Sequence, residues 1–178
     1  MNAIPHDPKE VIAVVDEHDK VIGETTRRAA HERGLWHREV YVYLINPEKR
    51  VLLHKRSDTG LWDHSSSGHF PKAQTYLDAA QREFEEELGI KLNAGELEEV
   101  GFEKIQTLGI SKINNHFARI FFVRKKVSLD EFKIDKKEVE EIKYFDKHEL
   151  TNLLNSSEKI MTGSAKIVIK KYVLPTLQ

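Results

Sequence analysis

Glutamate is concentrated near the middle of this 178-residue chain, where Glu83, Glu85, Glu86 and Glu87 fall within five positions. Glu83, Glu86 and Glu87 have the spacing i, i+3, i+4, so a helix would place their carboxylates on one face. Like charges at these spacings destabilise a helix by about 0.2–0.5 kcal/mol per pair, and a bound cation would offset that repulsion. Oxygen ligands suit Mg²⁺ or Mn²⁺, which usually bridge to substrate phosphates. The spacing therefore predicts a divalent metal site formed by Glu83, Glu86 and Glu87.

The segment around these glutamates has the periodicity of a helix from Thr75 to Leu88. Apolar side chains recur at steps of three and four, at Leu77, Ala80, Phe84 and Leu88. Thr75 and Asp78 have the spacing of a capping box at the start, and Gly89 is suited to end the helix. We therefore expect the glutamates to lie beside an apolar stripe that packs against a core.

The stretch from Gly68 to Ile90 resembles the Nudix box, in which a glycine precedes Arg-Glu-U-x-Glu-Glu-x-Gly-U and U is a bulky apolar residue. The matching residues are Gly68, Arg82, Glu83, Phe84, Glu86, Glu87, Gly89 and Ile90. One position departs, since Gln74 stands where the pattern has its first glutamate, which in the family is a structural partner more than a metal ligand. The match of a loop and a helix in register favours the resemblance over a solvated acidic helix.

This resemblance implies an α/β (α+β) fold, a Nudix-like α/β/α sandwich with a mixed central sheet. Residues 1–178 would form a single domain, with 1–8 as a loose lead-in and 68–90 as the loop and helix of the box. It also implies hydrolysis of a diphosphate, with Glu83, Glu86 and Arg82 as catalytic residues, Arg82 acting by orienting a box glutamate. An acidic residue outside the box assists the metal in many family members, and Glu138, Glu140 and Glu141 are the candidates here.

Three further residues are candidates for binding the substrate. Gly68 and His69 begin the box, and Arg56 closes a predicted strand just before the loop that leads into it. An arginine fork matches phosphate geometry, although arginine is also common on surfaces. In the same loop, Trp62 is expected to pack rather than to stack on a ligand.

A narrower resemblance covers most of residues 10–124, where VDEHDKVIG, RRAAH and a Gly-His after three serines are similar to isopentenyl-diphosphate isomerases and the Nudix hydrolases closest to them. Isomerisation needs an acid and a base on opposite faces of an alkene. The isomerases supply a cysteine before the Gly-His and a glutamate on a later strand. Ser67 and His116 stand at those places here, so we expect hydrolysis and keep isomerisation as the alternative.

The isomerases also hold a second metal on three histidines and two glutamates. His31, His37 and His69 match the histidines, although the His31 to His37 interval is one residue short, whereas Asn114 and His116 stand where the acids belong. The four imidazoles are an alternative set of zinc ligands, because zinc accepts nitrogen. A lone histidine is more often a packed or surface residue, so this second metal site stays open.

Composition narrows the class of protein. Hydrophobic residues make up 39% and charged residues 32% of the chain, and the net charge is −1, which does not favour a nucleic acid polymer or an anionic membrane. Cysteine is absent, which excludes disulfides and thiolate zinc sites. No apolar run approaches the roughly 20 residues of a membrane helix. We expect a cytoplasmic protein with a small-molecule diphosphate as its partner, and a homodimer is left open.

Hydrophobic alternation and turn residues give the remaining elements. Strands are expected at 10–15, 21–25, 38–45, 50–54, 99–107, 116–125 and 138–145, and helical segments at 27–33, 75–88, 148–154 and 165–174, the last stopped by Pro175. Because strands and helices are mixed in this order, we expect a mixed sheet with helices packed against it.

The expected function is Mg²⁺-dependent attack of water on a diphosphate linkage in a nucleoside-diphosphate-type molecule. One box carboxylate, Glu83 or Glu86, would accept the proton, and the resemblance does not assign which. A third alternative is a module that senses a nucleotide diphosphate without turnover. The complete set Glu83, Glu86 and Glu87 argues against it. Which diphosphate is cleaved is not written in the sequence.

Overall fold

The computed structural model describes residues 7–108 and 113–177, and an eight-stranded mixed sheet organises them. The strands are β1 Val11–Val15, β2 Val21–Thr26, β3 Trp36–Ile45, β4 Val51–Arg56, β5 Ser66–His69, β6 Glu98–Leu108, β7 Ile113–Arg124 and β8 Val139–Phe145. β3 is central, since it pairs with β1, β4 and β5 in antiparallel fashion and with β7 in parallel. The predicted mixed sheet is confirmed.

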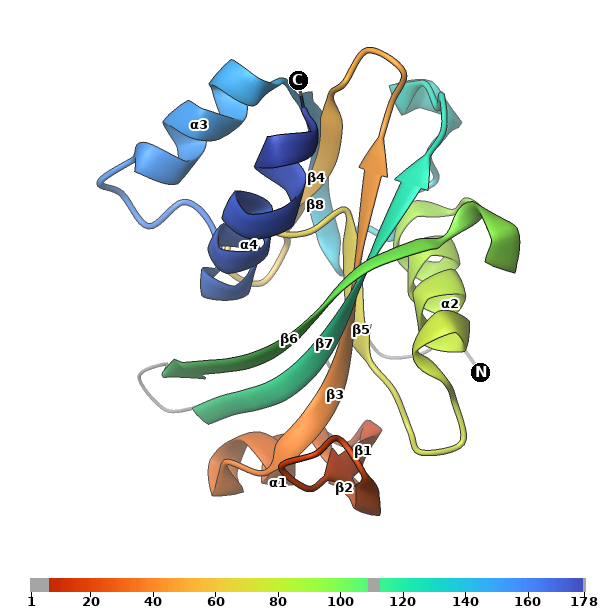
Figure 1. Ribbon diagram of the computed structural model, residues 1–178, viewed down its shortest axis with the longest axis vertical. Helices are drawn as coiled ribbons and strands as arrows, with labels where there is room; N and C mark the ends of the chain where they lie inside the picture. Colours follow the sequence, from red (N-terminus) through yellow and green to blue (C-terminus); the bar gives the residue numbers. More distant parts are fainter. Residues whose placement is uncertain (1–6, 109–112, 178) are drawn as a thin grey trace.

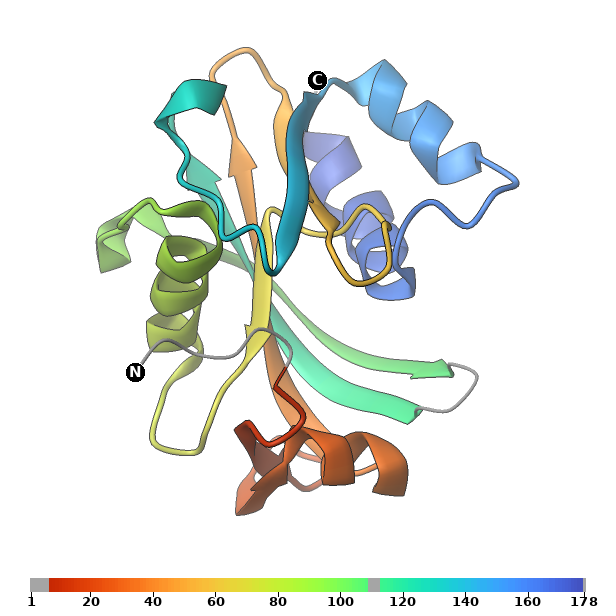
Figure 2. The same cartoon turned by 180° about the vertical axis from the view of Figure 1, so that it is seen from behind.

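Helices cover both faces of this sheet (Figures 1 and 2). The helices are α1 Arg27–Arg33, α2 Tyr76–Leu88, α3 Lys147–Asn155 and α4 Gly163–Val168. α2 lies on one side of β3 and β5, and α3 and α4 lie on the other (Figure 1). The expected α/β/α sandwich is therefore confirmed.

The alternation of β3 divides the core into two layers. Val40, Val42 and Leu44 point toward α2 and pack in one cluster with Phe84 and Leu88 of that helix. Tyr41, Tyr43 and Ile45 point the other way and pack in a second cluster with Val168 and Ile169. Successive strand residues face opposite sides, so one strand supplies both cores. Because β3 is buried on both faces, it is a rigid support for the polar side chains near its N-terminal end, His37 and Glu39.

α2 begins and ends at the residues that the sequence predicts. Thr75 Oγ1 accepts the backbone N–H of Asp78 at 3.2 Å, and Asp78 Oδ2 accepts the backbone N–H of Thr75 at 3.0 Å. Gly89 adopts the left-handed conformation at φ 72° and donates its backbone N–H to Glu85 O. These caps fix the helix axis, and with it the direction of the glutamates.

Two predictions need correction. The box was expected to begin as a loop, but Gly68 and His69 end strand β5, which pairs with Val40 and Glu39 of β3. The segment SSSGHF has few strand-forming residues, so this strand depends on its partner rather than on its own propensity. The helix expected at 165–174 begins at Gly163 and continues through a π-helical turn, Ile169–Val173, into a 3₁₀ turn that includes Pro175.

At the start of the chain, residues 1–6 of the expected lead-in lie outside the described residues. Asp7 and Pro8 are hydrogen-bonded, since Asp7 O accepts the backbone N–H of Glu10 at 3.0 Å and Pro8 O accepts that of Arg28 at 3.1 Å.

In the parts of the chain that the structure describes, no helix combines the length and the apolar character needed to cross a bilayer.

Candidate metal and diphosphate site

A cavity of about 270 Å³ lies where α2, β3, β4 and β5 converge, and we call it the box cavity. Its walls are formed by Asp7, Glu10, Arg27, Glu39, His54, Arg56, Ser67, Gly68, His69, Arg82, Glu83, Glu86, Glu87 and Glu138. Seven of these residues are acidic and three are arginines. Such a concentration of carboxylates creates a strong negative potential, which favours a cation in the cavity.

Glu83 is buried against strand β5. A Cβ placed on Gly68 would lie 2.0 Å from Glu83 Oε1, so this glycine makes room for the carboxylate. Burial raises the pKa of Glu83 well above its ordinary value, Arg82 opposes the rise, and Glu87 adds to it. A carboxylate that is costly to ionise alone is stabilised when a cation binds beside it. Gly68 thus acts by admitting Glu83 to the cavity.

Arg82 is the structural centre of the box. Its Nη2 donates to Glu83 Oε1 at 2.7 Å and to His69 O at 3.0 Å, and its Nη1 donates to Glu86 Oε2 at 2.7 Å. Its Nε donates to Gln74 Oε1 at 3.4 Å. Arg82 therefore contacts two box glutamates, Glu83 and Glu86. Gln74 keeps contact with Arg82 although it replaces the usual glutamate.

Glu87 is 3% exposed and lies on the strand side of α2. Its Oε2 lies 3.3 Å from His54 Nδ1, and its Oε1 accepts the backbone N–H of Ser67 at 3.4 Å. Glu86 is one residue earlier and more exposed, with 47% of its side chain accessible. The predicted set is therefore brought to one cavity, with Glu83 and Glu87 buried in the wall and Glu86 at the opening.

Of Arg56 and the acidic candidates outside the box, only some line the box cavity. Arg56 lines the cavity, and its guanidinium contacts Asp58 at 2.8 Å and Asp63 at 3.3 Å. Three acidic residues after the box were candidates, and of these Glu138 lines the cavity. Glu140 lies outside it and pairs with Lys55 at 3.0 Å, and Glu141 is exposed. Of the three candidates, Glu138 is thus the one that lies in the same cavity as the box glutamates.

The pKa of Glu138 is raised by burial and by neighbouring carboxylates, as that of Glu83 is. Burial raises it to about 7, and the nearby carboxylates of Glu87 and Asp135 add to the rise. Glu10, which the sequence reading did not single out, also lines the cavity, and burial raises its pKa. Only its position at the start of a predicted strand was visible in the sequence. The sequence limited the acid after the box to Glu138, Glu140 or Glu141, and the tertiary structure is needed to select Glu138 and to add Glu10.

Comparison with known proteins addresses the same region. The family model described as NUDIX domain matches residues 35–164, which include every residue of the box. The chain belongs to the Nudix family. Nudix hydrolase 3 from Arabidopsis thaliana is 34% identical over 163 residues, which cover 82% of this chain but 21% of that protein. The chain therefore spans about a fifth of this relative's length.

The similarity to isopentenyl-diphosphate isomerases that the sequence indicated is also supported. Isopentenyl-diphosphate delta-isomerase 2 from Homo sapiens is 33% identical over 182 residues, which cover 89% of this chain and 78% of that protein. Among solved structures, DR0079 from Deinococcus radiodurans has a TM-score of 0.69 at 20% identity and covers 92% of this chain and 99% of that one. The fold is thus that of a Nudix protein, and the sequence is similar to hydrolases and isomerases alike.

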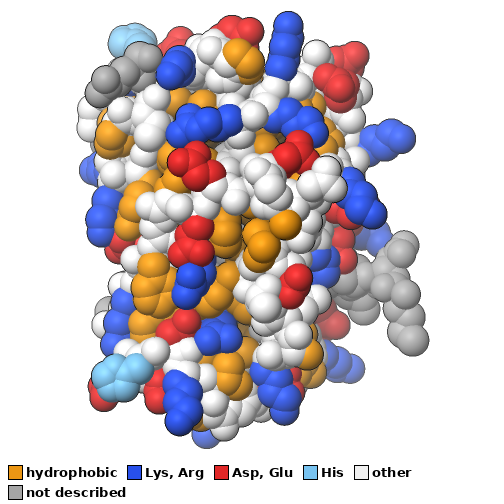
Figure 3. All heavy atoms as spheres, turned by 45° about the vertical axis from the view of Figure 1, so that its right-hand side comes forward, with side chains coloured by type: hydrophobic (Ala, Val, Ile, Leu, Met, Phe, Trp, Pro, Cys, Tyr) orange, Lys and Arg blue, Asp and Glu red, His pale blue; other side chains and the backbone are white. Residues whose placement is uncertain are grey.

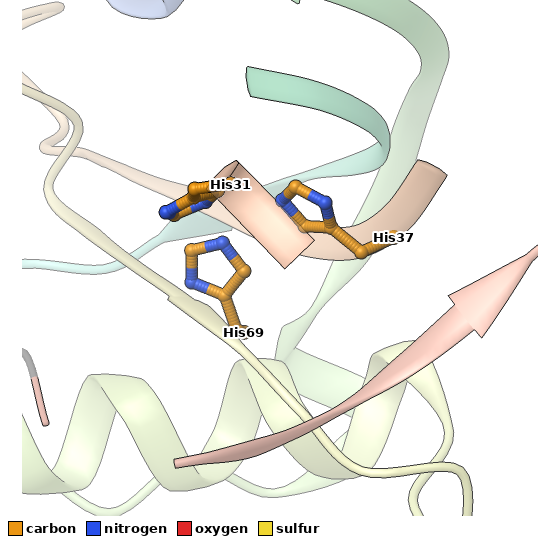
Figure 4. Close-up of side chains that lie close together, drawn as sticks. All are labelled: His31, His37 and His69. Carbon is orange, nitrogen blue, oxygen red and sulfur yellow. The ribbon is translucent and has the colours of Figure 1, made fainter. Parts of the chain in front are cut away.

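Beside the Nudix box, histidines from four elements form a second group, which we call the histidine cluster: His31, His37, His69 and His116, with Glu39. Donor atoms of His31, His37 and His69 all lie within 4.8 Å of one another, and so do those of His37, Glu39 and His116. The rings of the first three face one another from α1, β3 and β5 (Figure 4). The short interval between His31 and His37 does not separate them, since their ring centroids are 5.0 Å apart.

The histidine cluster has the chemistry of a metal site. His37 is fully buried, and its Nδ1 donates to Leu35 O at 2.9 Å, which leaves Nε2 with a lone pair. A ring held by a backbone carbonyl in this way is the usual support of a metal-binding histidine. Burial lowers the pKa of His37, His69 and His116, which keeps the imidazoles neutral and able to ligate.

Glu39 is the residue of this group that the sequence reading missed. Its Oε1 lies 2.9 Å from His69 Nε2 and its Oε2 lies 3.1 Å from His116 Nε2. Tyr41 donates its hydroxyl to the same Oε2 at 2.5 Å. The signal was present, because Glu39 follows His37 by two residues on a strand and so shares its face. Glu39 thus supplies an acid beside His116.

Proposed function

We propose that this protein hydrolyses a diphosphate linkage in a small molecule of the nucleoside-diphosphate type with the help of Mg²⁺ or Mn²⁺. The observation that carries the proposal is the pair of buried carboxylates, Glu83 and Glu87, in a cavity lined by seven acidic residues. Buried charges of one sign are costly unless a cation compensates them. An all-oxygen donor set fits a hard divalent cation.

In this proposal, Glu83, Glu86 and Glu87 hold the cation, and Arg82 keeps Glu83 and Glu86 in position through its hydrogen bonds. A bound cation would neutralise charge on the diphosphate and make a water molecule more acidic. A carboxylate at the cavity then accepts the proton from water. Glu83 and Glu86 are the box candidates, and Glu138, with its pKa near 7, is a third.

Arg56, Gly68 and His69 complete the proposed binding site. The Arg56 guanidinium is fixed by Asp58 and Asp63 at the cavity wall, so it can meet a phosphate with little loss of side-chain entropy. Figure 3 shows lysine, arginine and acidic side chains interspersed over the visible face, which does not suit a long polyanion. A small-molecule substrate fits these features better than a nucleic acid polymer.

A panel of nucleoside diphosphates and triphosphates, dinucleotides, CoA and prenyl diphosphates, with Mg²⁺ or Mn²⁺, would test the proposal. We expect hydrolysis of at least one compound, loss of turnover in EDTA, and product masses that place the cleavage within the diphosphate. Absence of turnover across the panel, with binding retained, would instead favour the sensing module.

Isomerisation of isopentenyl diphosphate is the second candidate, because the human isomerase is similar over 78% of its length. Two positions weigh against it. A serine hydroxyl at Ser67 is a far weaker acid than a cysteine thiol, whose ordinary pKa is about 8.5. His116 is fully buried, with its Nε2 2.5 Å from the Tyr41 hydroxyl. We expect no dimethylallyl diphosphate by NMR, from either the unmodified protein or Ser67→Cys.

We also infer that the histidine cluster binds a second cation, with zinc as the best match to its nitrogen donors. The support is the lone pair of His37 Nε2, directed toward a group of donors within 4.8 Å. Zinc bound by His31, His37, His69 and His116 would differ from the box cation in ligand type. Glu39 would provide its one oxygen ligand.

A further inference from the structure

A second cavity of about 220 Å³ adjoins the box cavity, and it differs from it in chemistry. The two share Arg27, Glu39, Arg56, Ser67 and His69, so they meet at the β3–β5 wall. The remaining walls come from His31, Tyr41, Asp63, His64, Thr107, Asn114, Thr162, Gly163 and Ser164. We call it the hydroxyl cavity, because five of its residues carry a hydroxyl group: Tyr41, Ser67, Thr107, Thr162 and Ser164.

Apart from Gly163, every residue that lines the hydroxyl cavity has a polar or charged group. Within the described part of the chain, no aliphatic side chain faces it. Its one aromatic carbocycle, Tyr41, is 2% exposed and stacks on the His64 ring at 3.7 Å between centroids. The cavity therefore offers little apolar surface and no open carbocyclic face to a ligand.

Several polar groups in this cavity are held in place before any ligand binds. Thr162 Oγ1 donates to Asp63 Oδ1 at 2.7 Å, and Asp63 Oδ2 lies 3.3 Å from Arg56 Nη1. The Ser164 hydroxyl lies 3.4 Å from His64 Nε2. Among the described residues, the hydroxyls of Ser67 and Thr107 make no hydrogen bond to a partner. The wall thus combines fixed polar groups with hydroxyls that are available to a ligand.

We propose that the hydroxyl cavity binds a sugar or another small polyhydroxylated group attached to the diphosphate. This inference rests on the proposed hydrolysis, because it assigns the diphosphate itself to the adjoining box cavity. The shared residue Arg56 lies at the boundary between the two moieties. The substrate class is therefore a diphosphate ester of a sugar or polyol.

Other groups fit this cavity poorly. A prenyl or alkyl chain gains about 25 cal/mol per Å² only when its surface leaves water for apolar contact, and it would leave the polar wall unpaired. A nucleobase would find no exposed carbocyclic ring to stack on, because Tyr41 is buried. The volume is below the roughly 300 Å³ at which drug-sized pockets begin, so one small ring fits better than a dinucleotide.

The test uses two matched substrates, methyl glucosyl diphosphate and methyl cyclohexyl diphosphate, which differ in the hydroxyl-bearing ring. With Mg²⁺, we expect kcat/KM to be at least tenfold higher for the glucosyl ester, because a site built for hydroxyls rejects an analogue that lacks them. The double variant Thr107→Val with Ser164→Ala should bring this ratio toward one. Thr151→Val, which removes a hydroxyl on α3 outside the cavity, is the matched control and should keep the ratio.

Equal or better hydrolysis of the cyclohexyl ester, or an equal loss for both esters in the double variant, would overturn the assignment. If neither ester is hydrolysed, the proposed activity fails by itself, and calorimetric titration with Mg²⁺ present decides about the cavity. A tenfold tighter Kd for the glucosyl ester, lost in the double variant, would support the hydroxyl cavity as a sugar site. Equal Kd values, or no binding of the glucosyl ester, would refute it.

Discussion

The Nudix box and the histidine cluster adjoin at Glu39 and His69, yet they are assembled in opposite ways. The box carboxylates Glu83, Glu86 and Glu87 come from one helix and five consecutive positions. The histidines come from α1, β3, β5 and β7 and meet only because the sheet aligns them, with His37 opposite His116 and Glu39 opposite His69. Local spacing forms the oxygen site, and tertiary pairing forms the nitrogen site.

This difference has a chemical consequence. The box offers oxygen donors, which suit a hard cation that keeps several of its waters and binds substrate phosphates. The histidine cluster offers imidazole nitrogens and one carboxylate, which suit a borderline metal. Glu39 and His69 belong to the cluster and also line the box cavity, so the two positions are adjacent. Substitutions that separate their effects are therefore the sharpest way to test the comparison.

The largest effect is expected at the box. Glu83→Gln and Glu87→Gln should each lower kcat by at least 100-fold, because each removes a charged ligand while keeping the shape of the side chain. Glu85→Gln, on the exposed face of the same helix, is the matched control and should change kcat less than threefold. Steady-state kinetics with Mg²⁺ measure this, and circular dichroism checks the fold. Near-native rates in both box variants would refute the metal assignment.

The same helix shows how far sequence alone can predict the site. Thr75 and Gly89 indicated its ends, and the three-and-four spacing placed Glu83, Glu86 and Glu87 on one face, because both signals are local. That Glu83 and Glu87 are buried while Glu86 is exposed was not predicted. β5 was not predicted, since Ser66, Ser67 and Gly68 have weak strand propensity and depend on β3 for pairing.

Residues that join the site through distant segments were the hardest to predict. Glu10 and Glu138 lie far from the box in sequence and reach it only through the sheet. Glu39 could have been found from its spacing to His37, but not its contact with His116, which depends on the β3–β7 register. The single domain over residues 1–178 stays a prediction, as do the roles of Arg56, Arg82 and His69.

A second prediction concerns the close approach of strand and helix at Gly68. Gly68→Ala would place a Cβ 2.0 Å from Glu83 Oε1, so the carboxylate must move. Because a side-chain end can shift more easily than backbone, we expect a loss of stability of only about 1 kcal/mol but a loss of kcat of ten- to 100-fold.

Gly95→Ala is the control for this substitution, since a Cβ there meets nothing within 4 Å. Thermal unfolding and kcat are measured on both variants. Unchanged kcat in Gly68→Ala would show that the exact position of Glu83 is unimportant.

A third prediction separates the two metal positions. His37→Ala should weaken zinc binding at least tenfold, because it removes a buried nitrogen donor that is already oriented by Leu35. Glu83→Gln should leave zinc binding within about threefold, since Glu83 is not part of the histidine cluster. Competition with a zinc-sensitive dye measures both, with His148→Ala on the surface of α3 as the control. Equal zinc affinity in His37→Ala and the unmodified protein would refute the second site.

The smallest expected effect is the pH dependence of stability from Glu138. Its pKa is raised to about 7 by burial first and by Glu87 and Asp135 next, so the folded state holds this proton more tightly than the unfolded chain does. The resulting stabilisation is fully present below the ordinary pKa of about 4.5 and is lost as pH rises toward 7.

Glu138→Gln has no carboxyl group to titrate, so it does not lose this stabilisation as pH rises. Between pH 5 and pH 8, the free energy of unfolding of Glu138→Gln should therefore rise by on the order of 1 kcal/mol relative to that of the unmodified protein, after allowance for screening by solvent. Thermal unfolding in EDTA at the two pH values measures the difference, and Glu140→Gln, whose carboxylate pairs with Lys55 outside the cavity, should show a smaller one. If the two variants respond to pH alike, the carboxylates of the box cavity do not act on Glu138, and the electrostatic contrast between the box and its surroundings is weaker than we infer.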